Sequence, residues 1–288
     1  MWIILSLLSA IFKSTEDLFN KKSLERINEF LTTWGFRGFA LLFSLPILFF
    51  ISIPNLDSQF WYALFISGGL NTLVFILYMK AIKISPLSVT VPMLTFTPLF
   101  LLITSPLILG EFPNKYGLIG ILLIVSGAYL LNIREKENGL LGPFKALVKE
   151  KGPLLMLLVA FIWSITANID RVGIKHSSPM FWVIAWNIFL FITLSIVILI
   201  KIKGGITSQV SRNIKTLLPA GLFSALNQIF MWTAVTMTLV PYVISIKRTS
   251  VIFSSLYGFF IFKERFIKTR LLGVVIMVAG VLLISLLS

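Results

Sequence analysis

The chain has 288 residues, of which 57% are hydrophobic and 12% are charged. Its mean hydropathy of +0.97 lies far above that of soluble globular domains, so a water-soluble fold is excluded and an integral membrane protein is expected. The net charge of +14 is spread over short connections between apolar runs, which argues against a nucleic-acid-binding domain and points to membrane topology.

Ten apolar runs are long enough to cross the hydrocarbon core as helices, which takes about 20 residues each. The sequence therefore predicts an all-α integral membrane fold. The first run contains Lys13, Glu16 and Asp17 and follows no basic region, so we expect a retained helix and not a signal peptide. The expected spans are about 2–19, 33–53, 60–80, 87–109, 116–132, 153–174, 179–200, 216–238, 241–262 and 270–287.

The first span carries charged side chains, each of which costs about 2.5–3.5 kcal/mol at the centre of a spanning helix. Lys13 and Asp17 are four residues apart, so they share a helical face and are expected to form an ion pair. The pair either neutralises itself within a polar stripe or contacts a substrate directly. Glu16 either competes for the same ammonium group or reaches the cytoplasmic interface.

Polar residues and prolines mark the third and fourth spans. Tyr78 is a candidate substrate contact, although polar side chains inside a bundle more often bridge helices. The fourth span contains Pro86, Pro92, Pro98 and Pro106, so a straight helix is not expected there. The bend serves either as a gate or ligand contact, or as a static feature of packing.

The chain repeats itself at a spacing of 153 residues, because residues 81–132 align with 234–285 at ten identities without a gap. Both copies contain the motif Glu-x8-Gly-x6-Gly. It comprises Glu111, Gly120 and Gly127 in the first copy and Glu264, Gly273 and Gly280 in the second. Two glycines seven residues apart share a helical face, so we expect close helix packing there, with the glutamates as helix-end residues and not catalysts.

Five spans in each copy give the two halves opposite orientations in the membrane. We predict two inverted five-helix repeats, residues 2–132 and 153–287, joined by a charged linker at 133–152. Inverted repeats are a recurrent design of secondary transporters, which bind a substrate near the midplane between the halves. The architecture thus predicts movement of a small molecule across a lipid bilayer.

The sixth span carries polar side chains in its outer half. Asn168 could supply an uncharged hydrogen bond to a substrate, while Asp170 and Arg171 are expected to form a polar cap at the interface. His176, the one histidine of the sequence, is expected in an exposed loop at a helix end.

The ninth span contains two adjacent cations, Lys247 and Arg248, six and seven residues beyond Pro241. At 1.5 Å per residue they lie about 10 Å inside the membrane. The aligned residues of the first half are Leu94 and Thr95, so packing shared by both halves does not require the charges. Because arginine binds a carboxylate or phosphate with two parallel hydrogen bonds, we predict an anion-binding wall. Alternatively, both side chains reach the interface or pair with carboxylates of other spans.

Basic residues are distributed unevenly among the connections. Nineteen of the 25 lie in the odd-numbered connections, a count that includes Arg37, whereas the even-numbered connections and the termini hold Lys115, Arg171 and Lys175. Basic connections remain on the cytoplasmic side, so both termini are expected outside the cytoplasm, most simply across the cell membrane.

Ten spans in two halves, with the repeated Glu-x8-Gly-x6-Gly motif, resemble the drug/metabolite transporter superfamily in its EamA-type branch. The segment Ala-Ile-Lys-Ile-Ser-Pro-Leu-Ser at 81–88 and the pair Trp163-Ser164 also match. The resemblance implies a carrier with a central cavity lined mainly by spans 1, 3, 4, 6, 8 and 9, without specifying a substrate. Lys247 and Arg248 further resemble the pair that binds phosphate in triose-phosphate translocators of the same superfamily.

The expected function is secondary transport of a small organic anion, either a carboxylate or an organic phosphate. The candidate contacts are Lys247, Arg248, Lys13, Asp17, Asn168 and Tyr78. Alternatives are export of amino acids or drug-like metabolites, translocation of a lipid-linked group, and a non-transporting receptor or assembly factor. With no cysteine, one histidine and few intramembrane carboxylates, no catalytic or metal site can be assembled, so neither an enzyme nor a cofactor is expected. The sequence does not predict the oligomeric state.

Overall fold

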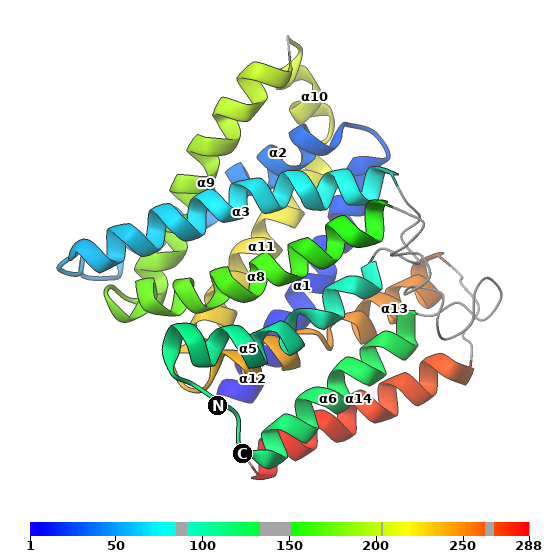
Figure 1. Cartoon of the computed structure of the whole chain (residues 1–288). Helices are drawn as coiled ribbons and strands as arrows, with labels where there is room; N and C mark the ends of the chain where they lie inside the picture. The colour runs from blue at the N-terminus through cyan, green and yellow to red at the C-terminus, as the bar shows by residue number, and fades with distance from the viewer. Residues whose placement is uncertain (85–90, 133–150, 203, 263–267, 288) are drawn as a thin grey trace.

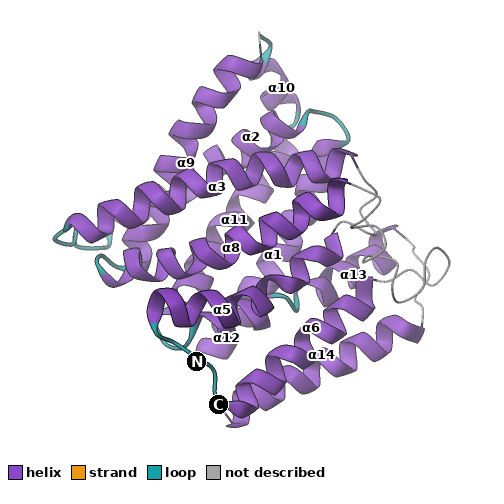
Figure 2. Cartoon of the chain, in the orientation of Figure 1, coloured by secondary structure: helices purple, strands orange, loops and turns teal. Residues whose placement is uncertain are grey.

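The computed structural model describes residues 1–84, 91–132, 151–202, 204–262 and 268–287, which form helices and turns without a strand (Figures 1 and 2). The first half contains α1 (Trp2–Leu24), α2 (Glu29–Ser44), η1 (Leu45–Phe49), α3 (Ser58–Ile84), η2 (Val91–Phe96), α5 (Thr97–Leu109) and α6 (Lys115–Asn132). The second half contains α8 (Lys151–Lys175), α9 (Pro179–Lys201), α10 (Ile206–Arg212), α11 (Ile214–Val235), α12 (Val240–Lys247), α13 (Ser250–Phe262) and α14 (Lys268–Leu287). Most of the predicted linker, Pro86 and Glu264 lie outside the described residues.

Long apolar helices show that the molecule is embedded in a membrane. Within the described residues, five segments are long and apolar enough to span it, and they belong to α2 with η1, α3, α8, α9 and α11. Shorter apolar helices lie at Met93–Leu109, Lys115–Leu130 and Leu272–Leu286. Large apolar side chains such as Phe49 and Leu107 are 89% and 80% exposed, as expected for a surface that faces lipid.

Capping residues place the starts of two helices. α2 begins at Glu29, four residues before the expected start, because Asn28 Oδ1 accepts a hydrogen bond from the backbone N–H of Leu31 at 2.8 Å. α9 begins after Ser178, whose hydroxyl oxygen accepts the N–H of Phe181 at 3.2 Å. The second span, expected at 33–53, lies at Glu29–Phe49 and consists of α2, which ends at Ser44, and the 3-10 helix η1.

The fourth and ninth spans are both interrupted, and the sequence predicted this for the fourth alone. Residues 91–96 form the 3-10 helix η2 before α5 begins. The ninth span, expected at 241–262, consists of two helices, because α12 ends at Lys247 and α13 begins at Ser250. Between them, hydrogen bonds run from Thr249 N to Ile246 O at 2.9 Å and from Val251 N to Arg248 O at 3.2 Å. These three-residue spacings tighten the backbone and break the α-helical ladder.

Helices from the two halves of the chain pack against each other. α6 lies along α14, α1 along α11 and α3 along α8 (Figure 1). At the α6–α14 contact, a Cβ atom on Gly120 would lie 2.8 Å from Gly280 O, and one on Gly127 would lie 2.5 Å from Gly273 O. The predicted packing role of the repeated glycines is therefore confirmed.

Four large rings, Phe60, Trp182, Trp186 and Trp232, form an aromatic cluster in the core. The ring centroids of Phe60 and Trp182 are 5.7 Å apart, and those of Trp186 and Trp232 are 5.3 Å apart. The contributing segments lie near the starts of α3 and α9 and the end of α11. The cluster thus fills one end of the bundle.

Candidate substrate-binding site

A cavity of about 330 Å³ lies among α1, α2, α3, α5, α8, α9, α11, α12 and α13. This volume falls within the range of roughly 300–1,000 Å³ that is usual for small-molecule sites. Its lining includes the charged residues Lys13, Glu16, Asp17, Lys21, Arg37, Asp170, Lys247 and Arg248. Ionisable groups are costly inside a membrane bundle, so their concentration around one cavity identifies it as the candidate site.

The α1 charges form a compact cluster. Lys13 Nζ lies 2.7 Å from Asp17 Oδ1 and 3.0 Å from Glu16 Oε1, which confirms the ion pair expected from their spacing. Glu16 is 2% exposed and also accepts a hydrogen bond from Asn227 Nδ2 at 3.4 Å, so it does not reach the interface. Asp17 is the more accessible partner, with 41% of its side chain exposed. Lys13 is therefore neutralised within its own helix.

Lys247 and Arg248 lie at the break between α12 and α13 and line the cavity. Lys247 Nζ donates to the thioether of Met231 at 2.9 Å, which is a weak acceptor. Arg248 Nη2 donates to Thr97 Oγ1 at 2.6 Å, at the start of α5. Among the described residues, neither cation has a carboxylate within 4.0 Å, so the alternative pairing with acidic residues is not formed.

Tyr78 and Asn168 differ in their placement. Tyr78 lines the cavity, and its ring centroid lies 5.7 Å from that of Trp163. Asn168 is fully buried and lies outside the cavity lining. Its Oδ1 accepts a hydrogen bond from Ser105 Oγ at 2.7 Å and its Nδ2 donates to Thr104 Oγ1 at 3.0 Å, so Asn168 joins α8 to α5. We therefore exclude Asn168 from the candidate contacts.

Sequence reasoning misplaced two charged residues. Arg37 was counted among the basic residues of the first connection although it falls inside the expected span 33–53; it lies within α2, is 6% exposed and lines the cavity. The capping residue Asn28 is a signal that could have corrected the count, since it starts the helix at Glu29 and puts Arg37 well inside it. Asp170 was expected in an interfacial cap, but it is 6% exposed, lines the cavity and accepts a hydrogen bond from Ser67 Oγ.

The sequence profile of the EamA-like transporter family matches residues 1–133 and 150–286. The chain belongs to the EamA-like transporter family. An uncharacterised transporter of Archaeoglobus fulgidus is 23% identical to it over 289 aligned positions, covering 99% of this chain and 98% of that protein. One crystal structure of a protein superposes with a TM-score of 0.79 at 15% identity, covering 99% of this chain and 96% of the other, and supports the fold. The protein is thus a membrane transporter of a small solute.

One end of the cavity of this EamA-like transporter is closed by side chains. Beyond the aromatic cluster, Arg171 Nη1 donates to Thr238 O at 3.1 Å, and Arg171 Nη2 lies 3.7 Å from Glu111 Oε1. Glu111, the acidic residue of the repeated motif, follows the end of α5, and its contact with Arg171 links this end to α8. The other end of the cavity is lined by the exposed residues Lys21 and Ser254. Access is therefore from the end where α1 finishes.

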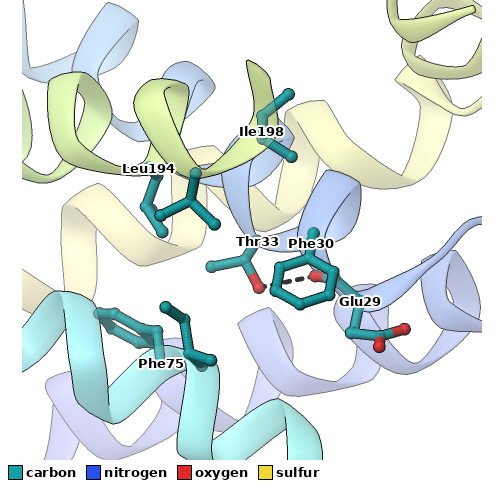
Figure 3. Close-up of a pocket in the computed structure, with 8 residues that line it drawn as sticks. Glu29, Phe30, Thr33, Phe75, Leu194 and Ile198 are labelled. Carbon is teal, nitrogen blue, oxygen red and sulfur yellow. Dashed lines mark hydrogen bonds between the residues drawn. The ribbon is translucent and has the colours of Figure 1, made fainter. Parts of the chain in front are cut away.

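A second hollow of the EamA-like transporter lies between α2, α3 and α9 (Figure 3). It is lined mainly by apolar side chains such as Phe30, Phe75 and Leu194, and Thr33 Oγ1 donates to Glu29 O at 2.8 Å beside it. Its volume of about 10 Å³ is close to the minimum for a single water molecule. The hollow is a packing feature and not a substrate site.

Proposed function

We propose that this EamA-like transporter carries a small organic anion, a carboxylate or an organic phosphate, by alternating access around the charged cavity. The proposal rests on the observation that Lys247 and Arg248 lack an acidic partner among the described residues of the cavity. Both line the cavity, and no described carboxylate lies within 4.0 Å of either. A cation without a paired carboxylate is unfavourable inside a membrane bundle, so an anionic ligand would relieve this cost.

The proposed contacts follow from the cavity wall. Arg248 keeps N–H groups beyond the one bonded to Thr97, and Lys247 has only a weak acceptor, so both can bind carboxylate or phosphate oxygens. Lys13 would act as a third cation by exchanging the accessible Asp17 for the substrate while Glu16 stays in place. Tyr78 would contribute a hydroxyl group from α3.

We further infer that ten spans form two inverted repeats at 2–132 and 153–287. In such a repeat α1 corresponds to α8, α3 to α11 and α6 to α14. The contact of α1 with α11 then has its counterpart in the contact of α8 with α3, and α6 packs against its own counterpart α14, and these contacts support the repeat. With the shift of 153 residues, the break at 248–249 falls on 95–96, where η2 ends. Interrupted helices at matching positions of two halves are typical of transporter substrate sites.

The basic connections favour an orientation with both termini outside the cytoplasm, as the sequence predicts. The cavity would then open toward the cytoplasm. Because the chain lacks cysteine, an introduced Ser58→Cys should react with an impermeant maleimide in intact cells, whereas Ser208→Cys should react only after permeabilisation. The opposite pattern would reverse the orientation.

A second candidate substrate is a zwitterionic amino acid, and Asp170 is the observation that favours it. Asp170 lines the cavity, and its described hydrogen-bond partner is the hydroxyl group of Ser67. It could therefore bind an ammonium group while Lys247 and Arg248 bind the carboxylate. This candidate predicts that Asp170→Asn abolishes binding, whereas carriage of a simple anion does not require Asp170.

A thermal-shift screen of the purified protein tests the proposal. Organic anions, amino acids and cationic drugs are compared, since a ligand at a hundredfold excess over its Kd stabilises by about 2.7 kcal/mol. We expect organic anions to stabilise the wild type. Lys247→Gln and Arg248→Gln should abolish this stabilisation, and the exposed control Arg212→Gln should preserve it. Stabilisation by cationic compounds, or full stabilisation of both cavity variants by anions, would contradict the proposal.

A further inference from the structure

Arg37 is a buried arginine on the α2 side of the cavity. Its guanidinium carbon lies 4.5 Å from the ring centroid of Phe75, 4.8 Å from that of Phe36 and 5.2 Å from that of Trp186. The aromatic rings pack around the guanidinium group and restrict its orientation. Arginine held in this way presents its N–H groups in a fixed direction.

The hydrogen-bonding capacity of Arg37 is mostly unused. Nη1 donates to Ser224 Oγ at 3.1 Å, whereas Nε is buried and has no acceptor among the described residues. No described carboxylate lies within 4.0 Å of the guanidinium group. Arg37 therefore keeps N–H groups that no described acceptor satisfies, and arginine N–H groups bind carboxylate and phosphate oxygens through charge-assisted hydrogen bonds.

The total charge of the cavity points to the same ligand chemistry. Among the described residues, its lining contains five basic residues, Lys13, Lys21, Arg37, Lys247 and Arg248, and three acidic residues, Glu16, Asp17 and Asp170. With each group in its ordinary ionised form, these described residues give a formal charge of +2. A bound molecule with two negative charges would balance it, whereas a monoanion would leave one positive charge uncompensated.

We propose that the cargo carries two anionic groups, one bound by Lys247 and Arg248 and the other by Arg37. The inference rests on the proposed anion transport and extends it, because Arg37 selects dianions over monoanions. Arg37 belongs to α2, whereas Lys247 and Arg248 lie at the break between α12 and α13. Separate helices would therefore bind the two anionic groups of the ligand.

The test compares monocarboxylates and dicarboxylates of matched chain length on the purified full-length protein. Binding of butyrate, succinate and glutarate is measured by calorimetry at about pH 7.5, where all are fully ionised. We expect a dicarboxylate to bind at least about tenfold more tightly than butyrate, because it makes the additional charge-assisted contact. Arg37→Gln should remove this preference by weakening dicarboxylate binding about tenfold while leaving butyrate binding unchanged.

Further variants separate a specific contact from a structural role. Arg37→Lys keeps the charge but not the paired N–H groups, so we expect a preference for dicarboxylates between those of wild type and Arg37→Gln. The lysine variant also replaces Arg37→Gln in the test if the glutamine variant does not fold. The exposed Arg212→Gln should behave as wild type. Equal binding of butyrate and dicarboxylates by the wild type, or equal weakening of both by Arg37→Gln, would overturn the inference. If the wild type binds no anion of either kind, the proposed function itself fails.

Discussion

Lys13 and Lys247 line the same cavity but differ in their partners. Lys13 has two carboxylate oxygens within 3.0 Å, whereas Lys247 donates to the Met231 thioether at 2.9 Å. A thioether does not compensate an ammonium charge, so Lys247 is the lysine that we propose as a ligand contact. Two lysines in one cavity can therefore have separate roles, one in a local ion cluster and one in recognition.

Asp57, in the connection before α3, gives a pH-dependent contribution to stability. The backbone N–H of Phe60 donates to its carboxylate at 3.0 Å, and His176 Nδ1 lies 2.6 Å from the other oxygen. The hydrogen bond from Phe60, together with the contact with His176, holds the pKa of Asp57 below its ordinary value of 3.8. The Phe60 bond is the larger cause of this shift. The stabilisation is therefore complete above that value and is lost as pH falls through the lower pKa of the folded state.

We expect Asp57→Asn to lower the melting temperature of the purified protein at about pH 6 and to have a smaller effect at about pH 3. His176→Gln should keep most of the wild-type pH dependence, because the bond from Phe60 remains. An Asp57→Asn penalty that is the same at both pH values would show that protonation of this carboxyl group plays no part.

Individual site residues could be predicted where the interaction is local in the chain. The Lys13–Asp17 pair follows from a spacing of four residues on one helix. Asn168 could not be assigned, because its partner Ser105 is 63 residues away and only the packing of α8 on α5 brings them together. Arg37 was missed for a different reason, since it was counted with the basic residues of the first connection although it falls within the expected span 33–53.

At the scale of elements, two interrupted helices meet at the candidate site. Arg248 at the α12–α13 break donates to Thr97 at the start of α5, which directly follows η2. The prolines of the fourth span predicted the first break. No proline lies near the second, where a run of three-residue hydrogen bonds replaces the α-helical pattern. Hydropathy does not detect this change in hydrogen bonding, so the break at 248–249 could not be predicted from the sequence.

Close packing of α6 and α14 leads to a prediction about Gly127. A methyl group there would lie 2.5 Å from the Gly273 carbonyl oxygen, so Gly127→Ala should force the helices apart and cost about 1–3 kcal/mol. The matched control is Gly69→Ala in α3, where a Cβ atom would have no neighbour within 4 Å. Thermal unfolding should show a lower melting temperature for Gly127→Ala alone. Equal melting temperatures for both variants would mean that the helices do not meet there.

At the scale of the whole molecule, the cavity is accessible from one end and closed at the other. The closure consists of the aromatic cluster together with the contacts of Arg171 to Glu111 and Thr238. These contacts join α8 to the ends of α5 and α11, so they must separate if access is to alternate. The composition and the repeat predicted the all-helical membrane fold, but the closed end depends on contacts between distant segments.

The most direct test of the proposed transport site is flux of an organic anion through protein reconstituted in liposomes. A labelled anion that stabilises the purified wild type is placed outside, and its uptake is compared for wild type, Arg248→Ala and the exposed control Arg212→Ala. We expect uptake by wild type and control, and loss of at least about tenfold with Arg248→Ala, because the charge-assisted contact proposed for Arg248 is removed. Binding without uptake by the wild type would indicate a receptor, and uptake by Arg248→Ala at the wild-type rate would contradict the proposed site.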